Sequence, residues 1–203
     1  MAKANPSFYQ KRVFEETNLW GKRYGRVLDI GCGEGREARL LASWGNKVTA
    51  VDVAKSKEWG QAPTGVIFEI GNGEQLKFKD RSFDLVFSKD ALHHTKNPKN
   101  MLLEAGRVCK KGGKVVFVEA NRYNPISFLH MTHYLGHNHF TQKSFKQMVK
   151  PIFPKSQLGS FEAHYYPFLP PALLSFLAKV EQQVSKLPFL GRWFSYNYFT
   201  ASV

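Results

Sequence analysis

Three glycines beside an acidic residue form the part of the sequence best suited to hold a ligand. An apolar run, Val27–Ile30, leads directly into Gly31, Gly33 and Gly35, and a helical pattern begins just after them. Glycines there let a ligand approach the backbone, and the start of a helix presents free amide hydrogens. The dinucleotide fingerprint GxGxxG would need its third glycine where this chain has Arg36. The spacing therefore predicts a ligand-binding turn but argues against a dinucleotide.

Two carboxylates indicate the charge of that ligand. Asp29 lies two residues before the first glycine, where it would repel a pyrophosphate and attract an ammonium group. Asp52 ends the second apolar run, about twenty residues past the turn, where an acid can accept hydrogen bonds from both ribose hydroxyls. Nicotinamide dinucleotides and S-adenosylmethionine both carry such a ribose, so only Asp29 favours one of them, the ligand with a cationic end.

Several segments, in order along the chain, resemble the motifs of one family. VLDIGCGEGRE (27–37) and VTAVDVAKS (48–56) resemble the first two motifs of class I S-adenosylmethionine-dependent methyltransferases, most closely the small-molecule, type 11-like branch. Residues 71–84 are similar to that family's GDAExLPFxDxSFD passage, and residues 87–94 resemble its LHH passage. Residues 111–114 match its PGG turn loosely. The resemblance covers residues 20–122.

The resemblance implies S-adenosylmethionine as methyl donor and S-adenosylhomocysteine as product. The backbone of Gly31, Cys32 and Gly33 would line the methionine and ribose, with Asp29 near the amino group. Ser88, just past the fourth apolar run, would contact the methionine end through its main chain.

The ribose and adenine contacts follow from the same resemblance. Asp52 would hold the ribose, and Val53 would offer an apolar surface to adenine. Asn72 would meet the exocyclic amine of adenine where the family usually has Asp, because its amide oxygen still accepts a hydrogen bond. Gly73, where Ala is usual, would present its backbone amide to the ring. The expected donor-binding residues are Asp29, Gly31, Cys32, Gly33, Gly35, Asp52, Val53, Asn72, Gly73 and Ser88.

The elements that position these residues follow from hydrophobic periodicity. Five short apolar runs alternate with helical stretches, a pattern typical of strands buried in a parallel sheet. The runs span 27–30, 48–51, 66–70, 83–87 and 114–118; helices are expected over 7–20, 37–44 and 100–108; and 192–203 alternates like a closing strand. The resemblance implies an α/β, Rossmann-like class I methyltransferase fold: a central, mostly parallel seven-stranded sheet flanked by helices, with an antiparallel C-terminal strand.

We expect residues 1–203 to form a single methyltransferase domain. Residues 20–122 would bind the donor, 123–150 would cap the acceptor, and 151–203 would add a C-terminal helix and closing strands. Because family members recognise acceptors with elements after the fifth strand, the candidate acceptor-binding residues are Tyr123, Phe128, His130, His133 and Tyr134. Large aromatic side chains favour a small, apolar or lipid-like acceptor. An apolar stripe over 172–187 favours a core helix over a membrane-surface helix.

The expected reaction is an SN2 transfer of the methyl group to an oxygen, nitrogen or carbon atom of the acceptor. The sulfonium methyl is already activated, so alignment is the main requirement and no metal is needed. His93 and His94 follow the fourth strand and are candidates for a general base, with a packing role as the alternative. The spacing of His130, His133, His137 and His139 resembles a metal cluster, but no Cys or carboxylate accompanies it.

A formal net charge of +13 leaves the partner open. The alternatives are an RNA methyltransferase that uses the basic surface, a donor-binding protein without catalysis, and peripheral contact with a membrane. No NPPY-type acceptor motif or long basic block supports the first, and the intact turn and Asp52 argue against the second. Two unpaired cysteines and an N-terminus without an apolar run favour a soluble, cytoplasmic protein with no transmembrane segment. The oligomeric state is not predicted.

Overall fold

Seven strands form one sheet in the described part of the chain. The computed structural model describes residues 7–61, 65–121, 139–162 and 196–203, together with 170, 173, 176, 179, 180, 183 and 194. The strands are β1 (Arg26–Ile30), β2 (Lys47–Asp52), β3 (Val66–Ile70), β4 (Phe83–Lys89), β5 (Cys109–Ala120), β6 (Gln157–Phe161) and β7 (Tyr196–Ser202).

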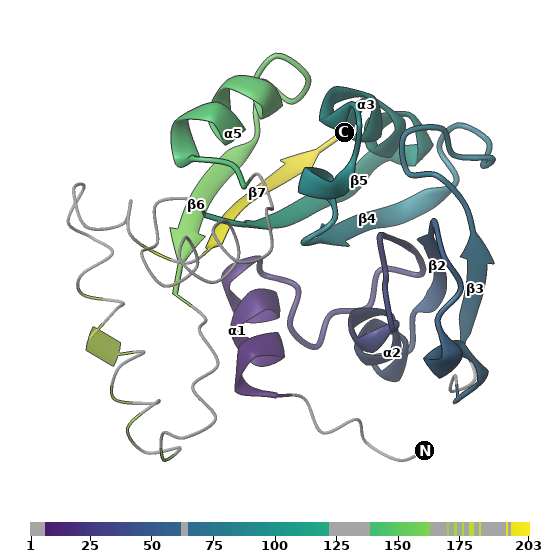
Figure 1. Cartoon of the computed structure of the whole chain (residues 1–203), viewed down its shortest axis with the longest axis horizontal. Coiled ribbons are helices and arrows are strands. Elements are labelled where there is room, and N and C mark those ends of the chain that lie inside the picture. The colour runs from purple at the N-terminus through teal and green to yellow at the C-terminus, as the bar shows by residue number, and fades with distance from the viewer. Residues whose placement is uncertain are drawn as a thin grey trace.

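The strand order is β3-β2-β1-β4-β5-β7-β6 (Figure 1). The first five strands pair in parallel, and β7 runs antiparallel to both β5 and β6. The predicted Rossmann-like fold, with its mostly parallel sheet and antiparallel C-terminal strand, is confirmed. The strand order reverses beside β1, so the carboxyl ends of β1 and β4 flank the crevice where ligands bind in such sheets.

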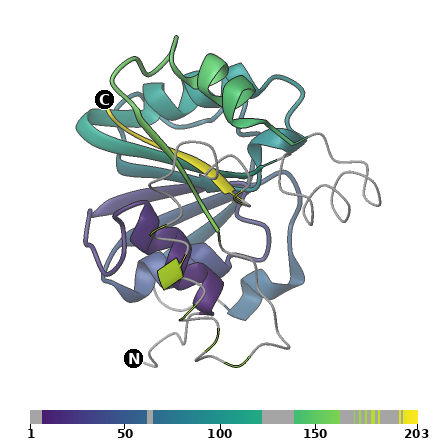
Figure 2. The same cartoon turned by 90° about the vertical axis from the view of Figure 1, so that its left-hand side faces the viewer.

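Helices cover both faces of the sheet. α1 (Phe8–Glu16) and α2 (Arg36–Ser43) lie on one face, and α3 (Pro98–Val108) and α5 (Gln142–Val149) lie on the other (Figures 1 and 2). Two short 3₁₀ turns, η1 (Lys57–Gln61) and η2 (Leu92–His94), follow β2 and β4. Most turns that can contact a ligand therefore extend from the carboxyl ends of the strands.

Two apolar clusters, one on each face, hold the layers together. The α1 and α2 side includes Phe14, whose ring stacks on Phe87 of β4 with centroids 5.2 Å apart. On the other side, Met101, Leu102, Ala105 and Val108 of α3 are all buried, which confirms the predicted stripe. Full burial of a large apolar side chain contributes about 1.5–3 kcal/mol, so these contacts fix the sheet beneath the site.

Helix α1 is shorter than the prediction of 7–20. It starts at a capping box in which Ser7 and Gln10 exchange side-chain and backbone hydrogen bonds. It ends at Glu16, because Asn18 adopts a left-handed backbone with φ of 56°. Leu19 is nevertheless fully buried, so the residues after the helix still belong to the core.

Strand β5 is longer than the predicted run of 114–118. It pairs with β4 at Phe83–Cys109 and again at Leu85–Lys114, so residues 110–113 bulge out of the ladder. Gly112, with φ of 75°, provides the turn predicted from the likeness of residues 111–114 to the PGG motif.

Hydrophobic periodicity in the sequence did not predict helix α5 or strand β6. Phe145 and Val149 are buried against the sheet, but five of the eight residues in α5 are polar, which obscures the stripe. In β6 only Phe161 is buried, as suits an edge strand with weak alternation.

The C-terminal stripe differs from its predicted core role where it can be assessed. Leu173 and Val180 are helical and 41% and 42% exposed. Within the described residues, no helix is both long and apolar enough to span a membrane.

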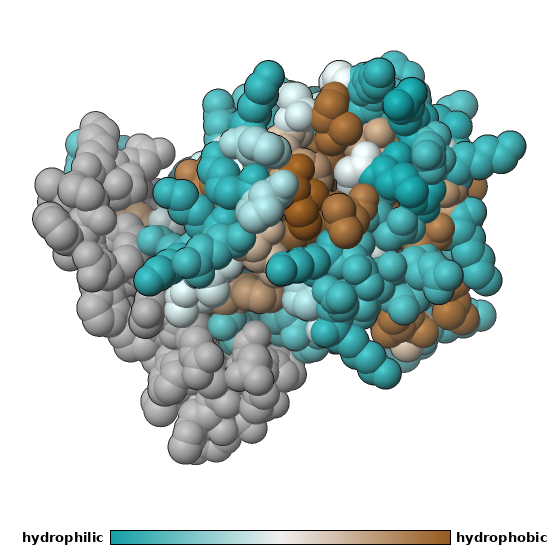
Figure 3. Space-filling model, turned by 90° about the horizontal axis from the view of Figure 1, so that it is seen from above, coloured by the Kyte–Doolittle hydropathy of each residue, from teal (hydrophilic) through white to brown (hydrophobic). Residues whose placement is uncertain are grey.

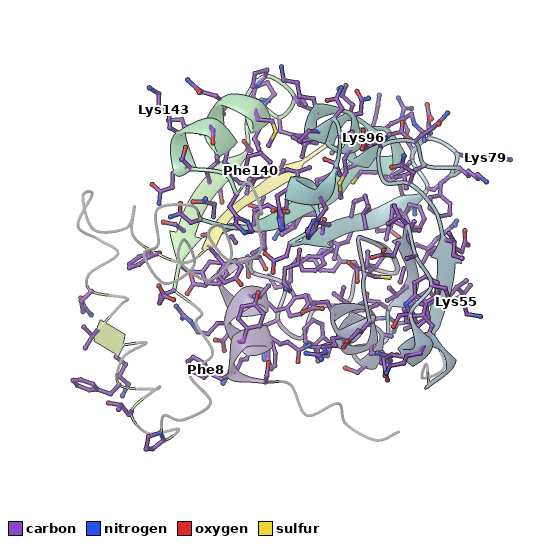
Figure 4. All side chains as sticks on the ribbon, viewed as in Figure 1. Phe8, Lys55, Lys79, Lys96, Phe140 and Lys143 are labelled. Carbon is purple, nitrogen blue, oxygen red and sulfur yellow. The ribbon has the colours of Figure 1, made fainter. Side chains whose placement is uncertain are left out.

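The surface over α3 and α5 is mostly hydrophilic, with apolar residues in a strip near its middle (Figure 3). Lys55, Lys79 and Lys143 point outward from separate regions of the molecule (Figure 4).

Candidate active site

The glycine turn is shaped by contacts that only glycine permits. Gly31 has φ of 73°, and a Cβ added to it would lie 2.1 Å from the Cβ of Ala91. Gly35, with φ of 80°, would place a Cβ 2.4 Å from the ring of Phe68. A Cβ on Gly33, with φ of 50°, would meet no atom within 4 Å. Gly31 and Gly35 therefore serve packing, while Gly33 faces open space.

A cavity of about 600 Å³ opens beside this turn. Six of the ten predicted donor-binding residues line it: Gly31, Gly33, Asp52, Val53, Asn72 and Gly73. Residues of the turn after β4 also line the cavity, among them Asp90, Ala91, His94 and Lys96. The sequence resemblance had placed the first set, whereas most of the second set was missed.

The carboxylate of Asp52 is held at the rim of this cavity. Its Oδ2 accepts a 2.7 Å hydrogen bond from the amide of Gly33, and its Oδ1 accepts one of 3.3 Å from the amide of Ala54. Val53 is 72% exposed and lines the cavity. An acid fixed by two backbone amides beside an exposed apolar side chain is suited to a nucleoside.

The turn at Asn72 forms the adenine-side wall of the expected site. The Asn72 amide oxygen accepts a 2.9 Å hydrogen bond from the amide of Glu74. The carboxylate of Glu74 then accepts from the amides of Lys96 and Asn97 at 2.9 and 3.0 Å, joining this wall to the turn after β4. The side-chain oxygen of Asn72 therefore accepts one hydrogen bond within its own turn and keeps one lone pair for a ligand.

Asp29 and Ser88 lie beneath the cavity rather than among its lining residues. Asp29 is 2% exposed, and its Oδ2 has no hydrogen-bond partner among the described residues. Burial, reinforced by Glu37, raises the pKa of Asp29 well above its usual value. Ser88 is fully buried, and its hydroxyl has no partner in the described part of the chain. A cation reaching Asp29 would compensate its buried charge.

A second, more polar hollow of about 690 Å³ shares Gly31, Gly33 and Asp90 with the first. It is lined by Cys32, Tyr9 of α1 and Lys89 of β4, among others. The amides of Gly31 and Cys32 both donate to the carbonyl of Val51, at 2.8 and 3.1 Å. These two amides are therefore engaged within the fold, and both residues line the hollow.

Lys89 is the charged centre of this second hollow. Its ammonium nitrogen lies 2.7 Å from Asp90 Oδ2, 4.0 Å from Glu37 Oε1 and 4.9 Å from the centroid of the Tyr9 ring. Burial alone would lower the pKa of Lys89, but Asp90 and Glu37 outweigh it and raise the pKa. Lys89 is therefore positively charged at neutral pH. The sequence pattern did not single out Tyr9, Lys89 or Asp90.

The two candidate catalytic histidines occupy different environments. His94 is exposed and lines the first cavity. The side chain of His93 is only 1% exposed, and its Nδ1 lies 2.7 Å from Oε2 of the fully buried Glu119. Its ring packs between those of His94 and His139, with centroids 4.0 and 4.3 Å away. Only His94 is placed to touch a ligand in the cavity.

Residues 28–117 match the model of a family described as a methyltransferase domain. Together with the cavity at the glycine turn and Asp52, this match makes residues 28–117 similar to the class I S-adenosylmethionine-dependent methyltransferases. The chain is 30% identical over 130 residues to the ubiquinone biosynthesis O-methyltransferase of Pseudomonas fluorescens, covering 58% of this chain and 52% of that one.

Two further proteins resemble the chain. It is 33% identical over 104 residues to a sarcosine/dimethylglycine N-methyltransferase of Aphanothece halophytica, covering 46% of this chain and 37% of that protein. A solved S-adenosylmethionine-dependent methyltransferase of Archaeoglobus fulgidus has the same fold, with a TM-score of 0.71, 15% identity, and coverage of 95% and 92%. The chain spans about half the length of the curated relatives it matches.

The predicted donor-binding residue Gly35 is not among the residues that line the cavity. Gly35 is buried as the residue preceding α2, where it packs against Phe68. The acceptor candidates Tyr123, Phe128, His130, His133 and Tyr134 lie outside the described residues. Glu119 was missed, although an acid inside the apolar run of β5 was a visible signal.

Proposed function

We propose that this chain binds S-adenosylmethionine and transfers its methyl group to a small acceptor. The cavity between the glycine turn, Asp52 and the Asn72 turn carries the proposal, because it joins a nucleoside-sized space to a buried, uncompensated carboxylate. Its position at the carboxyl ends of neighbouring parallel strands is where α/β sheets bind ligands.

The residues present fit this donor along its length. Asp52 would accept the ribose hydroxyls, and Val53 and Gly73 would lie against the adenine, where a larger residue than Gly73 would meet Ile30 at 2.7 Å. The methionine ammonium would reach toward Asp29. The carboxylate of the methionine moiety would point into the second hollow, where Lys89 supplies a positive charge.

When bound, the donor supplies a methyl group already activated by a sulfonium. The chain's own contribution is to hold the donor and acceptor in line and to exclude water, and such orientation can lower a barrier by roughly 7–11 kcal/mol. The glycine turn and the turn after β4 both line the cavity and would restrict the donor and the acceptor. No metal ligand set is required for this role.

We assign His94 as the residue that accepts a proton from the acceptor. It is the candidate histidine that lines the cavity, whereas His93 is committed to Glu119. An oxygen or nitrogen acceptor must lose its proton as the new bond forms, and imidazole is suited to receive it near neutral pH. The O- and N-methyltransferases among the relatives support an oxygen or nitrogen atom, and we propose a small, apolar or lipid-like acceptor.

Two measurements test this function. Titration calorimetry with S-adenosylhomocysteine should give saturable binding; no binding by the folded chain would refute the donor assignment. Cell extract incubated with the chain and an isotopically labelled methyl donor should then yield label in small, organic-soluble molecules. Label confined to nuclease-sensitive material would instead overturn the small-acceptor assignment.

A further inference from the structure

We propose that Glu119 is a positioning residue, whose buried carboxylate holds residues 90–94 against the glycine turn so that Asp90 and His94 face the donor cavity. The inference rests on the proposed function and names a residue outside the cavity on which that function depends. Glu119 itself lines neither hollow.

One carboxylate holds three consecutive residues. Oε1 of Glu119 accepts the amide hydrogens of Ala91 and Leu92 at 3.0 and 2.7 Å, and Oε2 lies 2.7 Å from Nδ1 of His93. Glu119 is near the end of β5 and fully buried. Hydrogen bonds to a buried carboxylate are short and strong, so they fix the turn to the sheet in one arrangement.

The turn needs such a support because its own conformation is unfavourable. Asp90 adopts φ of 52°, a left-handed backbone that costs a non-glycine residue free energy and persists only when its surroundings impose it. The amide of Asp90 donates to the carbonyl of Val118, next to Glu119, at 2.9 Å. Two successive residues of β5 therefore hold the turn.

The held turn presses directly on the donor-binding loop. Ala91 approaches Gly31 so closely that a Cβ on the glycine would lie 2.1 Å from the Ala91 Cβ. A shift of residues 90–92 would therefore move the glycine turn as well as Asp90 and His94. The Glu119 carboxylate thus positions both the glycine turn and residues 90–94 without lining the cavity itself.

His93 extends the same anchor to His94. The titratable groups that face His93 are Glu119 of β5, Lys89 and Asp90 at the end of β4, His94 of the same turn, and His139 ahead of α5. When His93 is neutral, a proton on Nδ1 donates to Glu119, which fixes the ring orientation. The His94 ring packs against this fixed ring, so its direction depends on Glu119.

Substitutions can separate the proposed role from simple support of the core. Glu119→Gln keeps an oxygen for the two backbone amides but places an amide nitrogen against His93 Nδ1, which reverses the hydrogen bond. His93→Asn keeps an N–H donor near the Nδ1 position, and His93→Leu removes it. Asp84→Asn is the matched control, because Asp84 also joins a backbone amide, that of Arg26, to a basic side chain, at the start of β4.

The experiment measures the affinity for S-adenosylhomocysteine by calorimetry, thermal unfolding by circular dichroism, and ¹⁵N-histidine and backbone-amide NMR spectra. Folded Glu119→Gln and His93→Leu should bind at least about tenfold more weakly, a loss of 1.4 kcal/mol. His93→Asn and Asp84→Asn should stay within about threefold of the unsubstituted chain. The amide resonances of Gly31 and Gly33 should shift in Glu119→Gln but not in Asp84→Asn.

Unchanged affinity and unchanged glycine resonances in folded Glu119→Gln would overturn the positioning role, even if the melting temperature fell. If Glu119→Gln does not fold, equal affinities of His93→Asn and His93→Leu would have the same consequence. A chain that binds no S-adenosylhomocysteine at all would refute the proposed function instead, and the glycine resonances would still decide the role of Glu119.

Discussion

Removal of the Asp52 carboxylate should weaken donor binding by about two orders of magnitude. Both of its oxygens accept from backbone amides at the cavity rim, and the proposed donor would add two ribose hydroxyls. A hydrogen bond to a charged group is worth about 1.5–3 kcal/mol, so losing two at the lower value costs roughly 3 kcal/mol, or about 100-fold in affinity. Asp52→Asn keeps one neutral acceptor oxygen and should lose about tenfold.

Calorimetry with S-adenosylhomocysteine measures these affinities. Glu15→Gln is a suitable control, because Glu15 carries a similar charge on the exposed side of α1, outside the cavity lining, and lies 3.7 Å from Lys11. Asp52 is half-buried, so thermal unfolding of Asp52→Ala should remain cooperative. If folded Asp52→Ala bound as tightly as the control, the ribose assignment would be wrong.

The remaining predictions concern the glycine turn and two buried titratable groups. Gly31→Ala should lower the free energy of unfolding by about 2 kcal/mol or more, because backbone strain and overpacking act together, whereas Gly33→Ala should cost only about 1–2 kcal/mol from strain; equal losses by chemical denaturation would refute the packing argument. Because burial raises the pKa of Asp29 and a ligand ammonium would lower it, S-adenosylhomocysteine binding should release protons and tighten as pH rises. Calorimetry in buffers of different ionisation enthalpy checks this, and Asp29→Asn should abolish the release. Burial lowers the pKa of His93, but the Glu119 carboxylate outweighs burial, so the pKa in the folded chain is raised. The stability that the protonated His93 contributes is therefore present below about pH 6.5 and is lost as the pH rises through this higher pKa. His93→Asn should flatten the melting temperature over that range; a slope equal to that of the unsubstituted chain would contradict the assignment.

The part of the site that could be predicted from sequence is the part built by consecutive residues. The glycine turn, Asp52, Val53 and Asn72 each follow a strand within a few positions, and the end of a buried strand is legible as an apolar run. Their placement at one cavity needed only the parallel order of β1, β2 and β3. The five strands from Arg26 to Ala120 were legible for the same reason.

The residues that were missed depend on contacts between distant segments. Tyr9 and Asp90 are 81 positions apart and meet at 3.4 Å only because α1 lies over the end of β4. Glu119 meets Ala91 across 28 positions, through the pairing of β4 with β5. No local periodicity encodes such pairs, although a charged residue within an apolar strand indicates that a partner must exist. Edge strand β6 was missed because its pattern of burial is too weak to be recognised.

A chain with a formal charge of +13 can still favour a cationic ligand at this site. Four acidic residues surround or underlie the two hollows: Asp29, Glu37, Asp52 and Asp90. Lys89 interacts with three of them, Asp29, Glu37 and Asp90. Exposed charges farther away than about 8 Å are largely screened at physiological ionic strength, whereas buried ones are not. The local acids therefore outweigh the scattered surface lysines. For the same reason Lys89 does not cancel the site's attraction for an ammonium: it is paired with Asp90 and Glu37, and Asp29 keeps an uncompensated oxygen beneath the cavity.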